Sequence, residues 1–181
     1  MKRDFDQVKF IKHNGVELPS KSTDLAGAFD LTARGIIAWY DAFNKSLTEE
    51  ELAQVNAAFK SGKKIALIKG DRICFDTDLQ VADVPVDFRG DIKSRSGLAL
   101  KNGVFVLNAD GLIDADYRNN LGVILTNISE EPFVVAMDDR IAQIEPRRGY
   151  EFEVVSTDTI TVPDSNRAGG FGSTGVSKED K

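Results

Sequence analysis

The chain has 181 residues, of which 41% are hydrophobic and 29% charged, and its 23 basic and 29 acidic side chains give a net charge of −6. This composition predicts one folded domain, and without a long apolar run or an apolar leader we expect a cytoplasmic protein that does not bind membranes. One cysteine and one histidine exclude a disulfide framework and any metal site built from several Cys or His ligands. The acidic balance also argues against nucleic acid as a partner.

Short segments rich in β-branched and aromatic residues recur between turn residues, which predicts a mainly β fold, either a sandwich or a closed barrel. The predicted strands are Val8–Lys12, Phe29–Ala33, Lys64–Lys69, Arg72–Phe75, Val86–Ile92, Val104–Leu107, Leu121–Thr126, Pro132–Ala136, Arg140–Glu145, Tyr150–Val155 and Thr159–Val162.

One helix interrupts this pattern. Ser46-Leu47-Thr48-Glu49 is typical of a capping box with Ser46 as the N-cap, and apolar residues follow at helical spacing at Leu52, Val55 and Phe59. We therefore expect an amphipathic helix over Thr48–Lys60 that docks on the β body.

Two polar motifs lie in the middle of the chain. Arg95-Ser96-Gly97 offers a guanidinium, a hydroxyl and backbone N–H groups, which are the donors that a phosphate needs, although a plain surface turn has the same composition. In the segment 108–117, Asp114 lies between two apolar residues, which predicts a partly enclosed carboxylate able to act as a general base. Gly111 permits close approach to the backbone, and the Asn108 amide can donate to and accept from a base. A polar β-turn is the alternative for this segment.

Two further motifs lie later in the chain. Alternation over Arg140–Ile144 places Arg140 and Ala142 on one face and Gln143 on the other, as a plain edge strand would also do. The glycine-rich segment 167–175 could wrap a polyphosphate with its backbone amides and contains one aromatic residue, Phe171. This tail is either a frayed terminus or a mobile lid.

In this order, the motifs resemble those of the trimeric dUTPases (dUTP pyrophosphatases). The five matching segments are Gly27-Ala28-Phe29-Asp30-Leu31, Arg95-Ser96-Gly97-Leu98-Ala99-Leu100-Lys101, Asn108 through Tyr117, Arg140-Ile141-Ala142-Gln143 and Gly169-Gly170-Phe171-Gly172-Ser173-Thr174-Gly175. The resemblance implies a jelly-roll-like β-barrel over residues 1–163 and a flexible C-terminal lid over 164–181. Because the first two motifs are further apart than is usual in the family, we interpret about 37–62 as an inserted segment that contains the helix.

The resemblance also implies an activity and a set of roles. Mg²⁺ binds the triphosphate of dUTP, and water attacks the α-phosphorus to give dUMP and pyrophosphate, which keeps uracil out of DNA and supplies dUMP for dTMP synthesis. Asp114 is then the general base, and the enzyme is a homotrimer whose sites are each built from three chains. By the same resemblance, uracil is read by Asn108, Gly111, Leu112 and Ile113, and Tyr117 packs on the deoxyribose. The phosphates are contacted by Arg95, Ser96, Gly97 and Gln143, and Arg140 is a further substrate-binding residue. Asp30 supports the water shell of the metal or the site arginines, and the nucleotide is covered by Arg167, Phe171, Gly172, Ser173 and Thr174.

Two alternatives remain open from the sequence. A dCTP deaminase shares the fold and the second motif but uses a glutamate in the third, and residues 108–117 contain none. A binding or signalling role would use the inserted segment 37–62 to contact a protein partner, whereas a purely structural insertion would pack its helix on its own barrel.

Overall fold

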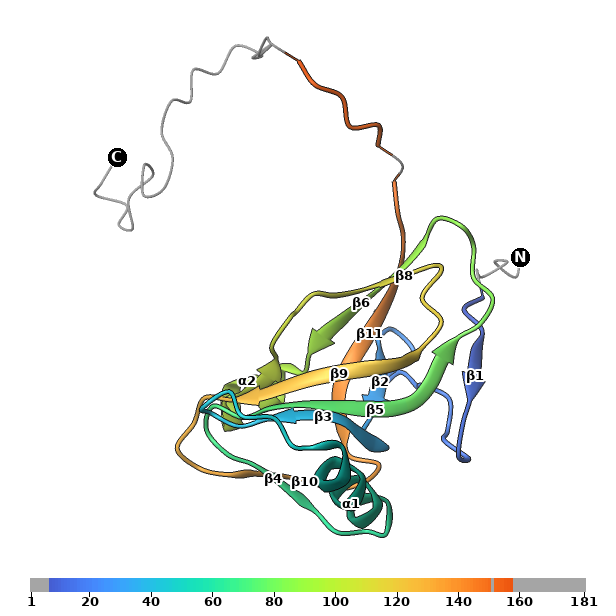
Figure 1. Ribbon diagram of the computed structural model, residues 1–181. Coiled ribbons are helices and arrows are strands. Elements are labelled where there is room, and N and C mark those ends of the chain that lie inside the picture. The colour runs from blue at the N-terminus through green and yellow to red at the C-terminus, as the bar shows by residue number, and fades with distance from the viewer. Residues whose placement is uncertain (1–6, 151, 158–181) are drawn as a thin grey trace. The chain divides into compact units, whose positions relative to one another are not determined.

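The computed structural model describes residues 7–150 and 152–157, and most of its strands lie in two sheets (Figure 1). The first has the order β1-β5-β9-β7, with β3 also paired to β5, and the second has the order β2-β11-β6-β8. Strands β4 and β10 form a separate antiparallel pair. The elements are β1 (Phe10–Lys12), β2 (Phe29–Thr32), β3 (Gly35–Tyr40), α1 (Glu49–Lys60), β4 (Ile65–Leu67), β5 (Arg72–Val81), β6 (Phe88–Ser94), α2 (Ser96–Asn102), β7 (Val104–Val106), β8 (Gly111–Asp114), β9 (Asn120–Asn127), β10 (Phe133–Val135) and β11 (Arg140–Arg148).

The core forms because each sheet directs alternate side chains inward. On β9, Leu121, Val123 and Leu125 are fully buried, as are Leu31 on β2 and Ile144 on β11. These residues belong to one hydrophobic cluster that draws on both sheets. Because burying one such side chain stabilises a fold by about 1.5–3 kcal/mol, this period-2 pattern accounts for the predicted mainly β fold, which the structure confirms.

The helix predicted over residues 48–60 is confirmed, but the predicted N-cap is wrong. Thr48 is the N-cap: its Oγ1 accepts from the Glu51 N–H at 3.2 Å, and a Glu51 carboxylate oxygen accepts from the Thr48 N–H at 2.9 Å. Because residues 49–51 are all glutamates, the capping box could pair Ser46 with Glu49 or Thr48 with Glu51, and the structure has the second. Ser46 instead forms an antiparallel β-bridge with Tyr40. The Thr48 backbone bond also lowers the pKa of Glu51.

Helix α1 packs on the sheet beside β3, with β4 and β10 next to it (Figure 1). Phe59 is fully buried with its ring centroid 6.0 Å from that of Phe75, and the Ile36 N–H donates to the Asn56 side chain at 2.9 Å. This packing supports the structural alternative for residues 37–62. A protein partner for that segment stays a prediction.

Two strands differ from the prediction in the first sheet. β3 begins at Gly35, just before the segment that we interpreted as an insertion, and runs into that segment. It pairs antiparallel with β5 from Gly35 opposite Asp76 to Tyr40 opposite Arg72. β5 continues to Val81, well past the predicted end at Phe75. Its extension includes Thr77 and Asp78, which are buried polar residues and interrupt the apolar pattern.

Two further expectations are wrong. A second helix, α2, begins at Ser96, where we expected a turn over Arg95-Ser96-Gly97. The good helix formers Leu98-Ala99-Leu100-Lys101 follow these residues. The predicted strand over 150–155 does not form at its described residues: Tyr150, Phe152 and Val154 are more than 80% exposed and lie in neither helix nor strand. The predicted strand Thr159–Val162 lies outside the described residues, and the predicted boundary at residue 163 is not tested.

We predict that Phe59→Ala lowers the free energy of unfolding by about 3–5 kcal/mol, because truncation leaves a cavity against Phe75. The exposed Gln54→Ala on the same helix is the control, with an expected change below about 0.5 kcal/mol. Urea unfolding of the two variants measures this difference. Equal stability of both would mean that α1 is not part of the core.

Candidate functional site

The carboxylate of Asp30 joins three predicted site residues. Asp30 is on β2 and only 6% exposed. Its Oδ1 lies 3.4 Å from Nε of Arg95 and accepts from Gln143 Nε2 at 3.3 Å, while its Oδ2 accepts from Arg140 Nη1 at 3.2 Å. The Nη1 of Arg95 also donates to the backbone carbonyl of Arg140 at 2.8 Å. A buried carboxylate with two guanidinium partners is electrostatically compensated, so this group holds both arginines in place.

A bulge in β11 brings Arg140 and Gln143 to the same carboxylate. Arg140 pairs with Thr32, but the next pairing is Ala142 with Leu31, so the ladder skips Ile141. The strict alternation that we expected, with Arg140 and Gln143 on opposite faces, is therefore wrong. β11 is also not an edge strand, because β2 and β6 flank it.

Helix α2 presents the second motif. Arg95 is its N-cap residue, and Ser96 and Gly97 are exposed in its first turn, where backbone N–H groups have no partner within the helix. Apart from its own helix and chain neighbours, no described residue lies within 4 Å of the position that a Cβ on Gly97 would take. This end of the helix is open to a ligand.

Asp114 is the last residue of β8, an edge strand paired only with β6 among the described strands. Alternation along β8 buries Ile113 and exposes Leu112 and Asp114. The predicted partly enclosed carboxylate is therefore wrong for one chain, because on an edge strand the outward side chain faces solvent. Among the described residues, no hydrogen bond or ion pair engages the Asp114 carboxylate.

The residues around β8 offer hydrogen-bonding groups and one aromatic ring. Asn108 is exposed in the turn before β8, and a Cβ on Gly111 would come within 3.2 Å of the Asn108 Nδ2. After β8, the Tyr117 hydroxyl donates to the Asn120 carbonyl at 3.1 Å, and burial of the half-buried ring raises the pKa of Tyr117. The outer edge of β8 adds backbone N–H and C=O groups that pair with no other described strand.

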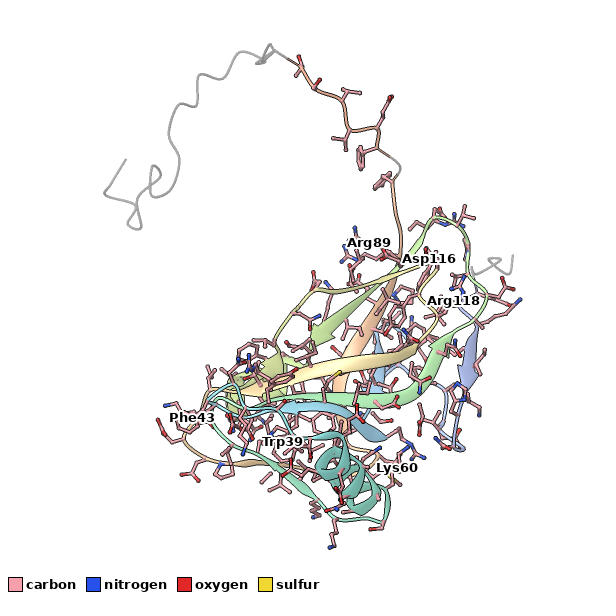
Figure 2. The ribbon with its side chains drawn as sticks, in the orientation of Figure 1. Trp39, Phe43, Lys60, Arg89, Asp116 and Arg118 are labelled. Atoms are coloured by element: carbon pink, nitrogen blue, oxygen red, sulfur yellow. The ribbon has the colours of Figure 1, made fainter. Side chains whose placement is uncertain are left out.

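The two halves of the candidate site are far apart within one chain. Asp114 is opposite Arg89 on β6, whereas Arg95 follows the other end of that strand. At a rise of about 3.3 Å per residue and a strand spacing of about 4.8 Å, the Cα atoms of Asp114 and Asp30 are roughly 20 Å apart. Figure 1 shows β8 and α2 well separated, and in the same view Asp116 and Arg89 lie at the end away from α2 (Figure 2).

Sequence reasoning missed a second buried carboxylate. Asp91 on β6 is 2% exposed, and its Oδ2 lies 3.2 Å from Arg89 Nη2 and 3.3 Å from Arg147 Nε. Only the spacing Arg-x-Asp on one strand hints at the first contact. Nothing local connects Asp91 with Arg147, because their strands are distant in sequence.

The donors suit a magnesium ion that the substrate carries. Among residues 7–150 and 152–157, no three His, Cys, Asp or Glu side chains are grouped to hold a metal. Both oxygens of Asp30 already have arginine or glutamine partners, whereas Asp114 is open. Mg²⁺ commonly binds through substrate phosphates, water and only one or two carboxylates, so this set fits such an ion.

The predictions about the tail and about cellular location are not tested by the described residues. The tail residues Arg167, Phe171, Gly172, Ser173 and Thr174 lie outside the described residues. In the described part of the chain, neither helix has the length and apolar character needed to cross a bilayer. The cytoplasmic location stays a prediction.

Comparison with known proteins gives a consistent result. A family model described as dUTPase matches residues 59–175, which include the second to fifth motifs. A deoxyuridine 5′-triphosphate nucleotidohydrolase from Methylocella silvestris is 45% identical over 120 residues, covering 66% of this chain and 74% of the relative. One from Beijerinckia indica is 41% identical over 120 residues, covering 66% and 73%.

The fold has solved counterparts as well. The dUTPase of Staphylococcus bacteriophage 80alpha, solved with dUPNHPP, has a TM-score of 0.67 at 17% identity and covers 95% of this chain and 100% of that one. This structural similarity is evidence for the fold alone. The evidence for the activity comes from the family model and the two relatives. The chain belongs to the dUTPase family and is an enzyme that hydrolyses dUTP.

Proposed function

We propose that this chain converts dUTP to dUMP and pyrophosphate with a water molecule that Asp114 orients and deprotonates. The water oxygen bonds to the α-phosphorus, the bond from that phosphorus to the bridging oxygen breaks, and the electron pair leaves with pyrophosphate. The proton of the water goes to the Asp114 carboxylate. The observation that carries this proposal is the exposed carboxylate at the end of β8, which no described side chain of its own chain neutralises. The product would supply dTMP synthesis and keep uracil out of DNA.

The edge of β8 would select the base. Its unpaired backbone groups and the Asn108 amide can match the O4 acceptor and the N3–H donor of uracil. Cytosine presents the opposite pattern at these two positions, which would leave polar groups unpaired in a closed site. The exposed Leu112 gives the base an apolar neighbour, and Tyr117 would pack on the deoxyribose.

The Asp30 cluster would hold the phosphates. Asp30 uses Nε of Arg95 and Nη1 of Arg140, so each guanidinium keeps further N–H donors for phosphate oxygens. Ser96 and Gly97 add a hydroxyl and backbone N–H groups at the start of α2. The tail, through Phe171 and its neighbours, would close over the nucleotide and exclude water.

Magnesium, when bound with the triphosphate, would offset phosphate charge and make the α-phosphorus easier to attack. Asp30 would then act mainly on the arginines, and any contact with the metal would pass through water.

The active site would be shared between chains of a homotrimer. One chain cannot place Asp114 and Arg95 on the same small nucleotide, because roughly 20 Å separate the two halves along and across the sheet. A symmetric oligomer brings the β8 edge of one chain to the Asp30 cluster of another, and rotation repeats that contact.

We predict that Asp114→Asn lowers kcat by about 10²–10⁴-fold, because the amide cannot accept the proton. Asp116→Asn, two residues further along and equally exposed, is the control and should stay within about threefold of the native rate. Pyrophosphate release from dUTP with Mg²⁺ measures both variants, with dCTP as the unreactive nucleotide. A native rate for Asp114→Asn would exclude Asp114 as the base.

Mixing two inactive variants tests the shared site. Arg95→Ala and Asp114→Asn are each expected to be nearly inactive, and their chains are unfolded together in equal amounts and refolded. If each site takes Asp114 from one chain and Arg95 from another, random assembly restores about one quarter of the native activity. No recovery, in mixed trimers confirmed by mass, would place both residues of a site on one chain.

We predict that Asp30→Asn lowers the free energy of unfolding by about 2–3 kcal/mol, because both arginines lose their buried counter-charge. The same change should lower kcat/KM by about tenfold or more, because the arginines are no longer held in position. Asp83→Asn also removes a carboxylate from an ion pair, but with Lys9 in solvent, and should cost less than about 1 kcal/mol. Denaturant unfolding and initial rates on dUTP compare the two. Indistinguishable variants would show that Asp30 does not organise the site.

A further inference from the structure

We propose that Asp91 is a positioning residue that keeps the Asp114 carboxylate unpaired by holding Arg89 away from it. This inference rests on the proposed role of Asp114 as the general base. It concerns a different carboxylate, which does not touch the substrate in this account.

The ladder places a cation directly beside the proposed base. Arg89 on β6 is opposite Asp114 on β8, and both side chains are on the exposed face of the sheet. Opposite charges in directly opposed positions of an antiparallel pair normally attract, and the Cα atoms of such pairs are only about 5 Å apart. A base paired in this way would be a poor acceptor for a proton from water.

Arg89 is directed elsewhere. Its Nη2 donates to Oδ2 of Asp91 at 3.2 Å, two residues further along the same strand and on the same face. Asp91 is 2% exposed, whereas the Asp114 side chain is exposed to solvent. Because solvent screens the buried carboxylate much less, it attracts the guanidinium more strongly than the exposed one does.

The neighbouring strand makes this arrangement necessary. Arg147 on β11 is directly opposite Arg89, so two like charges share one row of the sheet. The Asp91 carboxylate lies between them, 3.3 Å from Arg147 Nε, and Glu145 accepts from Arg147 Nη2 at 2.9 Å. Removing Asp91 would leave the two arginines to repel each other, and the exposed anion directly opposite Arg89 in the ladder is Asp114.

The other charged groups near Asp114 do not take over the role of Asp91 in holding Arg89. In the turn after β8, Arg118 donates through Nη1 to the carbonyls of Ala115 and Tyr117, and Asp116 adds a second negative charge. Figure 2 shows Arg89, Asp116 and Arg118 gathered at this end of the sheet. From β6 the facing groups are Arg89 and Asp91, and from β11, one strand further away, Arg147 and Glu145.

Two double variants with the same net charge test the proposal. Asp91→Asn/Arg147→Gln keeps Arg89 and frees it, so kcat on dUTP should fall roughly tenfold, and the acid limb of the pH–kcat profile should move to lower pH. The direction follows because a nearby guanidinium favours the ionised carboxylate. Asp91→Asn/Arg89→Gln removes the competing cation, so kcat should stay within about threefold of native and the acid limb should not move.

Removing one arginine with Asp91 limits the uncompensated charge, so both double variants should fold, and thermal unfolding checks that their stabilities match. Arg89→Gln alone should retain native kcat. Equal kcat values and equal pH profiles for the two double variants would overturn the proposal. A low kcat for Asp91→Asn/Arg89→Gln, at the same stability as the other double variant, would also overturn it. A failure of the base assignment is separate, because it would appear as activity in Asp114→Asn.

Discussion

The buried carboxylate of Asp30 is the group that holds together the proposed phosphate-binding half of this enzyme. It joins β2, the bulged start of β11 and the residue that begins α2, through contacts of 3.2 to 3.4 Å with Arg140, Gln143 and Arg95. A carboxylate this deeply buried is tolerated only when it is paired, and the arginines gain fixed positions in return. The sheet therefore supplies oriented cations at a place where local sequence would leave long, mobile side chains.

The same arrangement occurs twice on one face of the second sheet. Asp91, near the opposite end, is also buried and also binds two arginines, Arg89 and Arg147. In our account the first cluster offers its cations to a triphosphate, and the second withholds its cations from Asp114. In the proposed account, the separation of the two ends is the reason why a complete site would need a second copy of the chain.

Much of the fold could be predicted from the sequence, because β-branched residues alternate and the helix carries a capping box. The misses have physical causes. β5 runs through Thr77, whose hydroxyl donates to the Leu121 carbonyl at 2.9 Å. Because this buried part of the strand contains polar residues, its sequence does not show the apolar pattern of a strand. The N-cap was wrong by two residues because consecutive glutamates fit two registers.

The candidate site could be predicted only in part. Motif composition predicted Arg95 and Asp114 as site residues and the family resemblance added Asp30, and the structure joins Arg95 to Asp30. It could not reveal the bulge at Ile141, which turns Arg140 and Gln143 toward one carboxylate. It also could not reveal that Asp114 is exposed on an edge strand, or that Asp91 meets Arg147, since both depend on pairing between distant segments.

The central claim is that each site combines the β8 edge of one chain with the Asp30 cluster of another. A crystal structure of the full chain with Mg²⁺ and a non-hydrolysable dUTP analogue tests it most directly. We predict that every bound nucleotide has its uracil and α-phosphate beside Asn108 and Asp114 of one protomer and its phosphates beside Arg95 of a second. A nucleotide contacted by Asp114 and Arg95 of the same protomer would contradict this account.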